Sequence, residues 1–403
     1  MDELKVLFVH DHIFHQDQRG LFYSGGGLPC SVWSRYKKHF SHLTVIGRRA
    51  SKALATNDIS AYALSSAPQV DFHLLDNISG ITSRLKNMAT VREHVENLVR
   101  SHDAVIARLT SELGLLAITE ARKQGKPWAV ELVDCPWDAL WGYGSLTAKL
   151  YAPILRWRVR STMAKSSHAL YVTKEFLQDR YPCGEAVTIG CSNVEIPSLS
   201  EEVLAARLAR IQSLSLNRKL VFGLLGSLNG RLKGIHTVLQ ALSGLLHVLP
   251  PFEFRVLGGG DSVPWREEAT RLGLADIVFF DGVLPSGRAV YEWLDKIDIY
   301  LHPSFKEGLP RALIEAMSRG CPAIASNVAG TPELLSKEFL ISPGDVDGLA
   351  DKINQLFRST DTLAQAANDN FFRADSYSTD KLNKKRDEFW RSFAEHCRKD
   401  KQI

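Results

Sequence analysis

The 403-residue sequence is poor in cysteine, and its six cysteines form no recognisable pattern. No CxxC pair occurs, so neither a zinc site nor a disulfide framework is indicated, and reduced thiols in a cytosolic protein are favoured. No segment reaches the ~18 uninterrupted apolar residues typical of a membrane span. Two acidic residues precede the short apolar run in MDELKVLFVHD, which favours a first strand over a signal peptide. We therefore expect a cytoplasmic protein, in which any membrane contact is peripheral, at the cytoplasmic face.

The sequence also lacks a large excess of charge of either sign. A net charge of +4 is too small to indicate a nucleic-acid partner, and we expect none. With 45% hydrophobic and 23% charged residues, the composition is that of a globular chain. Because single cores stop growing at about 250–300 residues, this length predicts two domains.

Short β-rich runs alternate with longer amphipathic stretches along most of the chain, a pattern typical of parallel βαβ units. The alternation predicts an α/β fold with two Rossmann-like domains facing a cleft. We place the N-terminal domain at 1–200 and the C-terminal domain at 219–377. The polar segment 201–218 is interpreted as their linker. The charged stretch 378–399 is expected to form one long helix.

The stretch FKEGLPRALIEAM (305–317) follows a predicted strand at 298–304 and carries two glutamates. Pro310 suits the first position of a helix, whose N-terminus can bind an anion. Glu315 is embedded in an apolar run and needs hydrogen-bond donors, which a ribose diol offers. Glu307 can reach hydroxyls beyond the phosphates, so the pattern fits a nucleotide sugar. Alternatively, Glu315 pairs with Arg311 or Arg319 and Glu307 only caps the helix.

Two glycine-containing loops follow other predicted strands. In LLGSLNGRLKGIHTVL (224–239), Arg231 and Lys233 can neutralise a diphosphate, although a solvated basic loop is the alternative. In YSGGGLPCSVW (23–33), three glycines allow close backbone approach to a ligand. This loop has neither GxGxxG nor GK[ST] spacing, so a plain tight turn is equally compatible with it.

The chain resembles glycosyltransferase family 4 of the GT-B fold, most strongly over 219–350. KEGLPRALIEAM fits the E-x7-E signature of that family. Three further segments match in the family's order: RLGLADIVFFDGVLP (271–285) beside the nucleobase, SRGCPAIASNVAGTPELL (318–335), and LISPGDVDGLADKI (340–353). The resemblance implies a GT-B fold, a C-terminal helix that crosses back onto the N-terminal domain, and a retaining transferase.

The resemblance also implies roles for individual residues. Glu315 would hold the ribose hydroxyls, and Glu307 would contact the transferred sugar near its reacting carbon. Gly308 and Leu309 would offer backbone contacts to that sugar. Lys233 matches the phosphate-binding lysine of the family.

Other positions match less fully. Gly26 and Gly27 would approach the diphosphate from the N-terminal domain. Ser227 stands where the family often has arginine, and Arg231 is our candidate replacement. Asp134 is the nearest acceptor- or sugar-side candidate where a histidine is common. The three loop segments 23–33, 224–239 and 305–317 contain no DxD cluster, and we expect neither a metal nor another cofactor.

These features predict a retaining glycosyltransferase that moves a sugar from a UDP- or GDP-sugar to a glycan or lipid-linked acceptor. The resemblance implies a place in bacterial lipopolysaccharide, capsule or exopolysaccharide synthesis. The basic, aromatic stretch 155–165, with Tyr36, Lys37 and Lys38, can rest on anionic lipid. The alternative is a solvated helix face with Trp157 packed inward.

Two other functions remain open. A nucleotide-sugar epimerase on the same fold would need acid and base groups near the sugar, and His10, Asp11 and His12 are candidates. A non-catalytic nucleotide-sugar or glycan-binding protein would bind without turnover.

Overall fold

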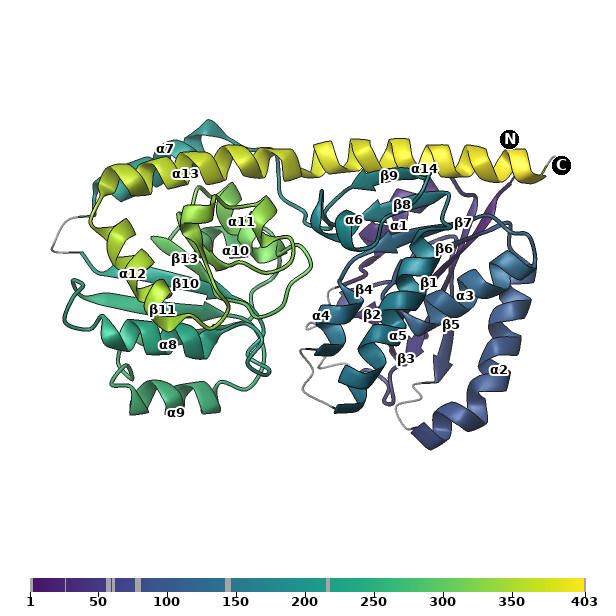
Figure 1. The fold of residues 1–403 in the computed structure, drawn as a ribbon, viewed down its shortest axis with the longest axis horizontal. Helices are drawn as coiled ribbons and strands as arrows, with labels where there is room; N and C mark the ends of the chain where they lie inside the picture. Colours follow the sequence, from purple (N-terminus) through teal and green to yellow (C-terminus); the bar gives the residue numbers. More distant parts are fainter. Residues whose placement is uncertain are drawn as a thin grey trace.

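The computed structural model describes residues 3–25, 27–55, 59, 62–76, 81–141, 146–214 and 218–401. It contains two α/β units side by side, each built around its own largely parallel sheet (Figure 1). Two consecutive helices run along one side of the molecule, α13 (Thr360–Ala374) over the C-terminal unit and α14 (Thr379–Lys401) over the N-terminal unit. This confirms the predicted fold class of two parallel-sheet domains.

The N-terminal sheet has nine strands. Seven of them pair in parallel in the order β5-β3-β1-β6-β7-β8-β9, and β2 and β4 extend the end of β1 in antiparallel pairing. Their bounds are β1 Lys5–Gln16, β2 Phe22–Ser24, β3 His42–Arg49, β4 Ala63–Leu64, β5 Val70–Asp76, β6 Ala104–Leu109, β7 Trp128–Leu132, β8 His168–Tyr171 and β9 Val187–Gly190. The central strands β6 and β7 are buried along their whole length, as expected of strands covered on both faces.

Among the described residues, six helices accompany this sheet: α1 Cys30–Lys37, α2 Ile81–Arg100, α3 Glu112–Lys123, α4 Pro136–Trp141, α5 Leu146–Met163 and α6 Phe176–Arg180. Ser111 caps α3 by accepting a hydrogen bond from the Gly114 amide (2.9 Å). That cap fixes the start of α3 directly after β6, at the carboxyl edge of the sheet.

The C-terminal sheet is wholly parallel, in the order β12-β11-β10-β13-β14-β15. Its strands are β10 Leu220–Leu225, β11 Phe252–Leu257, β12 Val278–Gly282, β13 Ile299–His302, β14 Ala323–Ser326 and β15 Leu340–Ile341. Its helices are α7 Glu201–Gln212, α8 Ile235–Gly244, α9 Val263–Arg271, α10 Arg288–Leu294, α11 Arg311–Ser318, α12 Val346–Phe357 and α13 Thr360–Ala374.

The linker region that we predicted at 201–218 contains the packed helix α7. Ser200 caps this helix, and α7 lies against α13. Its buried Arg207 donates hydrogen bonds to the carbonyl oxygens of Leu294 (2.9 Å) and Arg319 (3.0 Å). Because α7 is anchored to the C-terminal unit, the chain crosses between the sheets before it, in 191–200.

The last helix, α14 (Thr379–Lys401), follows α13 after a short 3-10 turn and runs along the N-terminal domain (Figure 1). Trp390 contacts the ring of Tyr36 at 5.2 Å between centroids, and Phe393 contacts Phe40 at 6.1 Å. At the crossing point the Thr379 amide donates to the Ile196 carbonyl (2.9 Å), so both interdomain segments lie together. None of the helices within the described ranges is both long and apolar enough to cross a membrane.

Candidate active site

Lys233 and Glu307, predicted from separate motifs, form a direct ion pair. The Lys233 Nζ lies 2.6 Å from the Glu307 Oε1, although the residues are 74 positions apart. Lys233 precedes α8 and Glu307 follows β13, so the pair joins loops at the carboxyl edge of the C-terminal sheet. This is the edge where open α/β sheets bind ligands.

Two local features fix Lys233 in this position. Gly234 has a φ of +72°, and a Cβ there would lie 2.0 Å from the Pro303 carbonyl oxygen, so the tight approach of the two loops requires glycine. The stem of Lys233 covers Gly226, where a Cβ would lie 3.0 Å from the lysine Cγ. Glycines at both places let the lysine reach across to Glu307.

His302 completes this cluster and was missed by the sequence reasoning. Its Nε2 lies 3.0 Å from the Glu307 Oε1 and 3.3 Å from the Ser304 Oγ, and the residue is buried at the end of β13. Burial raises the pKa of Glu307, but His302 and Lys233 together outweigh it and lower that pKa to about 2. Glu307 is therefore a carboxylate at any physiological pH.

The N-terminus of α11 lies beside this cluster. Pro310, which we predicted as the first helical residue, is the N-cap and provides no side-chain cap. Within the described part of the chain, the amides of Gly308 and Leu309 donate no hydrogen bond to protein. Glu307 does not cap the helix either, so that alternative is not what the structure shows. The loop thus presents unused backbone donors and the positive end of a helix dipole.

Glu315 lies one turn further into α11. Neither arginine proposed as its alternative partner forms an ion pair with it. Arg319 pairs with Asp295 at 2.8 Å, and no Glu315–Arg311 ion pair forms in the described structure. Burial raises the pKa of the Glu315 carboxyl to about 6, and Arg311 only partly opposes this shift. Glu315 is thus a mostly buried carboxyl group without a protein donor among the described residues.

Asp134 meets the same loop from the N-terminal domain. Its Oδ2 lies 2.8 Å from the Nζ of Lys306, the neighbour of Glu307. A Cβ on Gly308 would lie 2.6 Å from the Val133 carbonyl oxygen, so only glycine allows this approach of the domains. Burial raises the pKa of Asp134 despite Lys306. The structure therefore brings this candidate beside the predicted sugar-binding loop.

A second interdomain contact was not predicted. The carboxylate of Glu333 accepts hydrogen bonds from the backbone amides of Lys174 (2.6 Å), Glu175 (3.1 Å) and Phe176 (2.8 Å) at the start of α6. A carboxylate of one domain thus satisfies the free donors of a helix in the other. Together with Lys306–Asp134, it holds the two domains in contact.

Other candidates lie apart from the cluster. The Arg231 side chain is exposed and lies 3.7 Å from the Glu268 carboxylate, not beside Glu307. The Ser227 Oγ accepts a hydrogen bond from the Asn229 amide (3.2 Å). Gly27 is in the loop after β2, where a Cβ would lie 3.3 Å from His12. The prediction for Gly26 lies outside the described residues.

The acid–base trio of the epimerase hypothesis is tied into the N-terminal domain. Burial, together with Arg108, lowers the pKa of His10 to about 3 and that of His12 to about 4. Both imidazoles are therefore neutral at pH 7. The Asp11 carboxylate accepts from Arg48 (2.9 Å) and from the Glu112 amide (2.6 Å). The His10 Nδ1 lies 3.1 Å from the Arg108 carbonyl oxygen, and the His12 Nε2 lies 2.7 Å from the Ser24 Oγ. All three groups therefore have structural partners, and no observation favours the epimerase.

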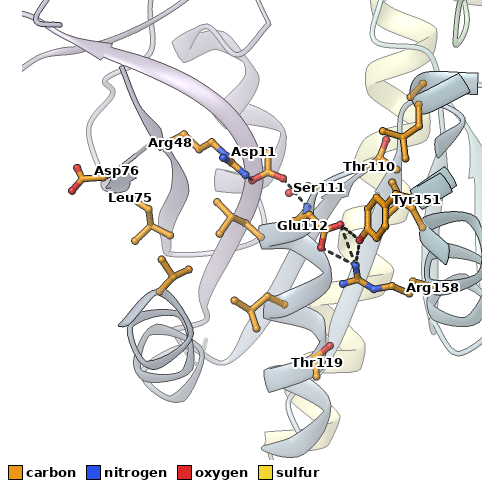
Figure 2. A pocket seen from close by; sticks show the side chains of 16 residues that line it. Asp11, Arg48, Leu75, Asp76, Thr110, Ser111, Glu112, Thr119, Tyr151 and Arg158 are labelled. Carbon is orange, nitrogen blue, oxygen red and sulfur yellow. Dashed lines mark hydrogen bonds and ion pairs between the residues drawn. The ribbon is translucent and has the colours of Figure 1, made fainter. Parts of the chain in front are cut away.

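The N-terminal domain contains a cavity of about 690 Å³ (Figure 2). Two ion pairs mark its polar side: Asp11 with Arg48, and Glu112 with Arg158 at 2.8 Å. Its other walls are mainly aliphatic: Leu75, Val91, Leu113, Leu116, Leu140 and Leu155. Asp11 lies in β1, and Glu112 begins α3 directly after β6, so these two strands and α3 supply the polar side of the cavity.

The sequence also matches known proteins. Residues 219–359 match the family model described as glycosyl transferases group 1. The chain is 28% identical to Protein CapJ of Staphylococcus aureus over 352 residues, which cover 87% of this chain and 86% of CapJ. It is 33% identical over 146 residues to a putative colanic acid biosynthesis glycosyltransferase, WcaL, of Escherichia coli, covering 33% of this chain and 35% of WcaL.

Solved structures match almost the whole chain. Sucrose-phosphate synthase of Thermosynechococcus elongatus superposes with a TM-score of 0.71 at 16% identity, covering 98% of this chain and all of that one. Anabaena Alr3699/HepE in complex with UDP-glucose gives a TM-score of 0.66 at 19% identity, covering 97% and 100%. The chain therefore has the GT-B fold. Its C-terminal half carries a group 1 glycosyltransferase domain.

Proposed function

We propose that this protein is a retaining glycosyltransferase of family 4 that uses a nucleotide-sugar donor. The observation that carries the proposal is the juxtaposition of the Lys233–Glu307 pair with the uncapped start of α11 and the unpartnered Glu315. A cation, backbone donors and two carboxylates thus meet at one sheet edge. A diphosphate with a sugar at each end complements them: its phosphates suit the cation and the backbone donors, and the hydroxyls of its two sugars suit the two carboxylates.

The donor would be bound as follows. Glu315 accepts hydrogen bonds from the ribose hydroxyls, and Lys233 moves from Glu307 to the diphosphate. Glu307 then accepts from hydroxyls of the transferred sugar, while the amides of Gly308 and Leu309 also face that sugar. His302 remains bonded to Glu307 and keeps it oriented. HepE, a structural neighbour, binds UDP-glucose, which supports a UDP-sugar, with a GDP-sugar as the second choice.

The reaction would break the bond between the anomeric carbon and the phosphate oxygen. Lys233 and the α11 N-terminus stabilise the negative charge that develops on the leaving diphosphate, and Arg231 joins them if it leaves Glu268. The acceptor hydroxyl attacks from the same face and passes its proton to a phosphate oxygen. Glu307 stabilises the oxocarbenium-like sugar electrostatically. We expect this chemistry to proceed without a metal.

The acceptor would enter from the N-terminal domain, where Asp134 borders the sugar-binding loop. The cavity beside α5 is large enough for part of a glycan or a lipid-linked sugar. The match to WcaL, described as a putative colanic acid biosynthesis glycosyltransferase, supports a role in bacterial cell-surface polysaccharide synthesis. Such an enzyme would work in the cytoplasm, at the inner face of the membrane.

The first test is a thermal-shift panel of UDP, GDP, ADP, CMP and their common sugars, with EDTA and with magnesium. A ligand at 100 times its dissociation constant stabilises a fold by about 2.7 kcal/mol. We expect one nucleotide to stand out, equally with EDTA. A flat panel would refute the nucleotide site. Turnover of the donor without any acceptor would indicate an epimerase, and saturable binding without turnover would indicate a binding protein. The anomeric configuration of the product, by NMR, tests retention.

A further inference from the structure

Helices α4 and α5 expose an unusual amount of apolar surface. The described chain has 15 large hydrophobic side chains in the exposed class, and five of them lie within residues 141–157. They are Trp141 (50% exposed), Leu146 (78%), Leu150 (76%), Ile154 (53%) and Trp157 (69%). The last four recur at helical spacing and form one outward stripe on α5. The alternative in which Trp157 packs inward is therefore wrong.

The core does not account for this stripe, because α5 already buries another face. Ala152, Leu155, Val159 and Met163 point into the domain. Leu155 also lines the cavity, together with Tyr151 and Arg158 of the same helix (Figure 2). The helix is thus apolar on both sides, and its outer side has no cover among the described residues.

The charge along the stripe is mainly positive: the one acid of α4, Asp138, is paired with Arg180 at 3.1 Å. Residues 139–165 contain five cationic side chains and no aspartate or glutamate. Arg158 turns inward to Glu112, whereas Arg156, Arg160 and Lys165 are exposed. Two cations also rest over indole rings: the Lys149 Nζ lies 5.6 Å from the Trp141 ring centroid, and Arg156 lies 5.7 Å from that of Trp137.

We propose that this outer face of α4 and α5 docks on an anionic lipid bilayer. A helix with exposed leucine, isoleucine and tryptophan beside basic side chains suits the interface between lipid headgroups and acyl chains. The excess of positive charge on α5 favours anionic headgroups over a neutral surface. Neither Tyr36 nor the lysines after it take part, because Tyr36 is buried, Lys37 bonds to the Pro68 carbonyl and Lys38 lies beside Asp387 of α14.

The position of α5 gives this docking a consequence for catalysis. Its outer face would lie in the bilayer surface, while its inner face lines the cavity. A helix is only about 10–12 Å across, so a lipid-linked acceptor in the bilayer would lie close to that cavity. This step rests on the proposed function, whereas the docking itself depends only on the stripe and its charges.

The test is sedimentation of the full chain with vesicles of phosphatidylcholine, alone or with one third phosphatidylglycerol, in the absence of nucleotide. We expect binding to the anionic vesicles. The double variant Leu150→Ser/Ile154→Ser should reduce the partition coefficient at least tenfold. Phe372→Ser, which changes an equally exposed residue on α13, should leave it unchanged. Arg156→Gln/Arg160→Gln should weaken binding to anionic vesicles severalfold.

Each outcome bears on the proposal. Unchanged melting temperatures would show that the exposed substitutions leave the fold intact. Equal binding by wild type and the Leu150/Ile154 variant would overturn the proposal. The proposal would also be overturned if sedimentation velocity showed that the wild type forms a dimer, that this variant is monomeric, and that the dimer does not bind vesicles. Vesicle binding with a flat nucleotide panel would refute the proposed function and leave the docking surface standing.

Discussion

Glu315 allows a prediction that separates ligand binding from structure. In the free protein its pKa is about 6, against 4.5 for an ordinary glutamate. Between these values the folded chain binds a proton that the unfolded chain does not, so stability falls as pH rises through this window. Above pH 6 the ionised carboxylate costs about 2 kcal/mol of folding free energy, because a tenfold change in proton affinity corresponds to about 1.4 kcal/mol.

Glu315→Gln removes this charge and keeps the shape of the side chain. At pH 7.5 it should raise the stability of the C-terminal domain by up to about 2 kcal/mol, which is roughly 4–8 °C in melting temperature for a domain of this size. The gain should vanish near pH 4.5. Nucleotide affinity should fall at least tenfold, since hydrogen bonds to charged groups contribute about 1.5–3 kcal/mol each.

The assay is a pair of melting curves, with and without the nucleotide found in the panel, at pH 4.5 and 7.5. Glu267→Gln, on the exposed side of α9, is the matched control and should change neither quantity. A Glu315→Gln protein that is less stable than wild type at pH 7.5, or that binds nucleotide as tightly, would refute the reasoning. The first result would show that the carboxylate has a structural partner, and the second that it does not hold the ribose.

The remaining predictions concern the cluster and the domain contact. Glu307→Ala should lower turnover at least 100-fold while nucleotide affinity changes little; wild-type turnover would remove it from the site. Lys233→Met should destabilise the free protein by about 1–3 kcal/mol, because the Glu307 carboxylate loses a hydrogen-bond partner. Glu307→Gln in the same chain should restore much of this loss, and denaturant unfolding of both variants tests the coupling. Glu333→Gln should speed amide hydrogen exchange at 174–176 at least tenfold, and unchanged protection would show that this carboxylate does not hold the domains.

Much of the C-terminal site could be predicted because its parts follow strands in the sequence. The alternation of apolar runs placed Lys233 and Glu307 after two strands, and parallel strands bring their carboxyl ends to one edge. His302 was missed although it ends the strand before Glu307, since a lone histidine in an apolar run is more often part of the core. The side chain of Arg231 could not be placed, because Glu268 lies on a helix that the loop sequence does not specify.

The contacts between the two domains could not be predicted from the sequence, for a different reason. Lys306 and Asp134 are remote in the chain, and their pairing depends on how two separate sheets are oriented. The spacing of apolar residues in the sequence carries no information on that orientation. The outward stripe of α5 was likewise hidden, because Leu150 and Leu155 look alike in sequence and only the packing shows which one is covered.

The long helix α14 also affects how the chain is completed during synthesis. Trp390 and Phe393 supply part of the apolar surface that covers Tyr36 and Phe40, yet they are made some 350 residues later. The N-terminal domain therefore leaves the ribosome first, and its core lacks the side chains of α14 until that last helix has been synthesised. A stop codon after α13 would keep the C-terminal domain whole and leave the core of the N-terminal domain partly uncovered, exposed to chaperones and proteases.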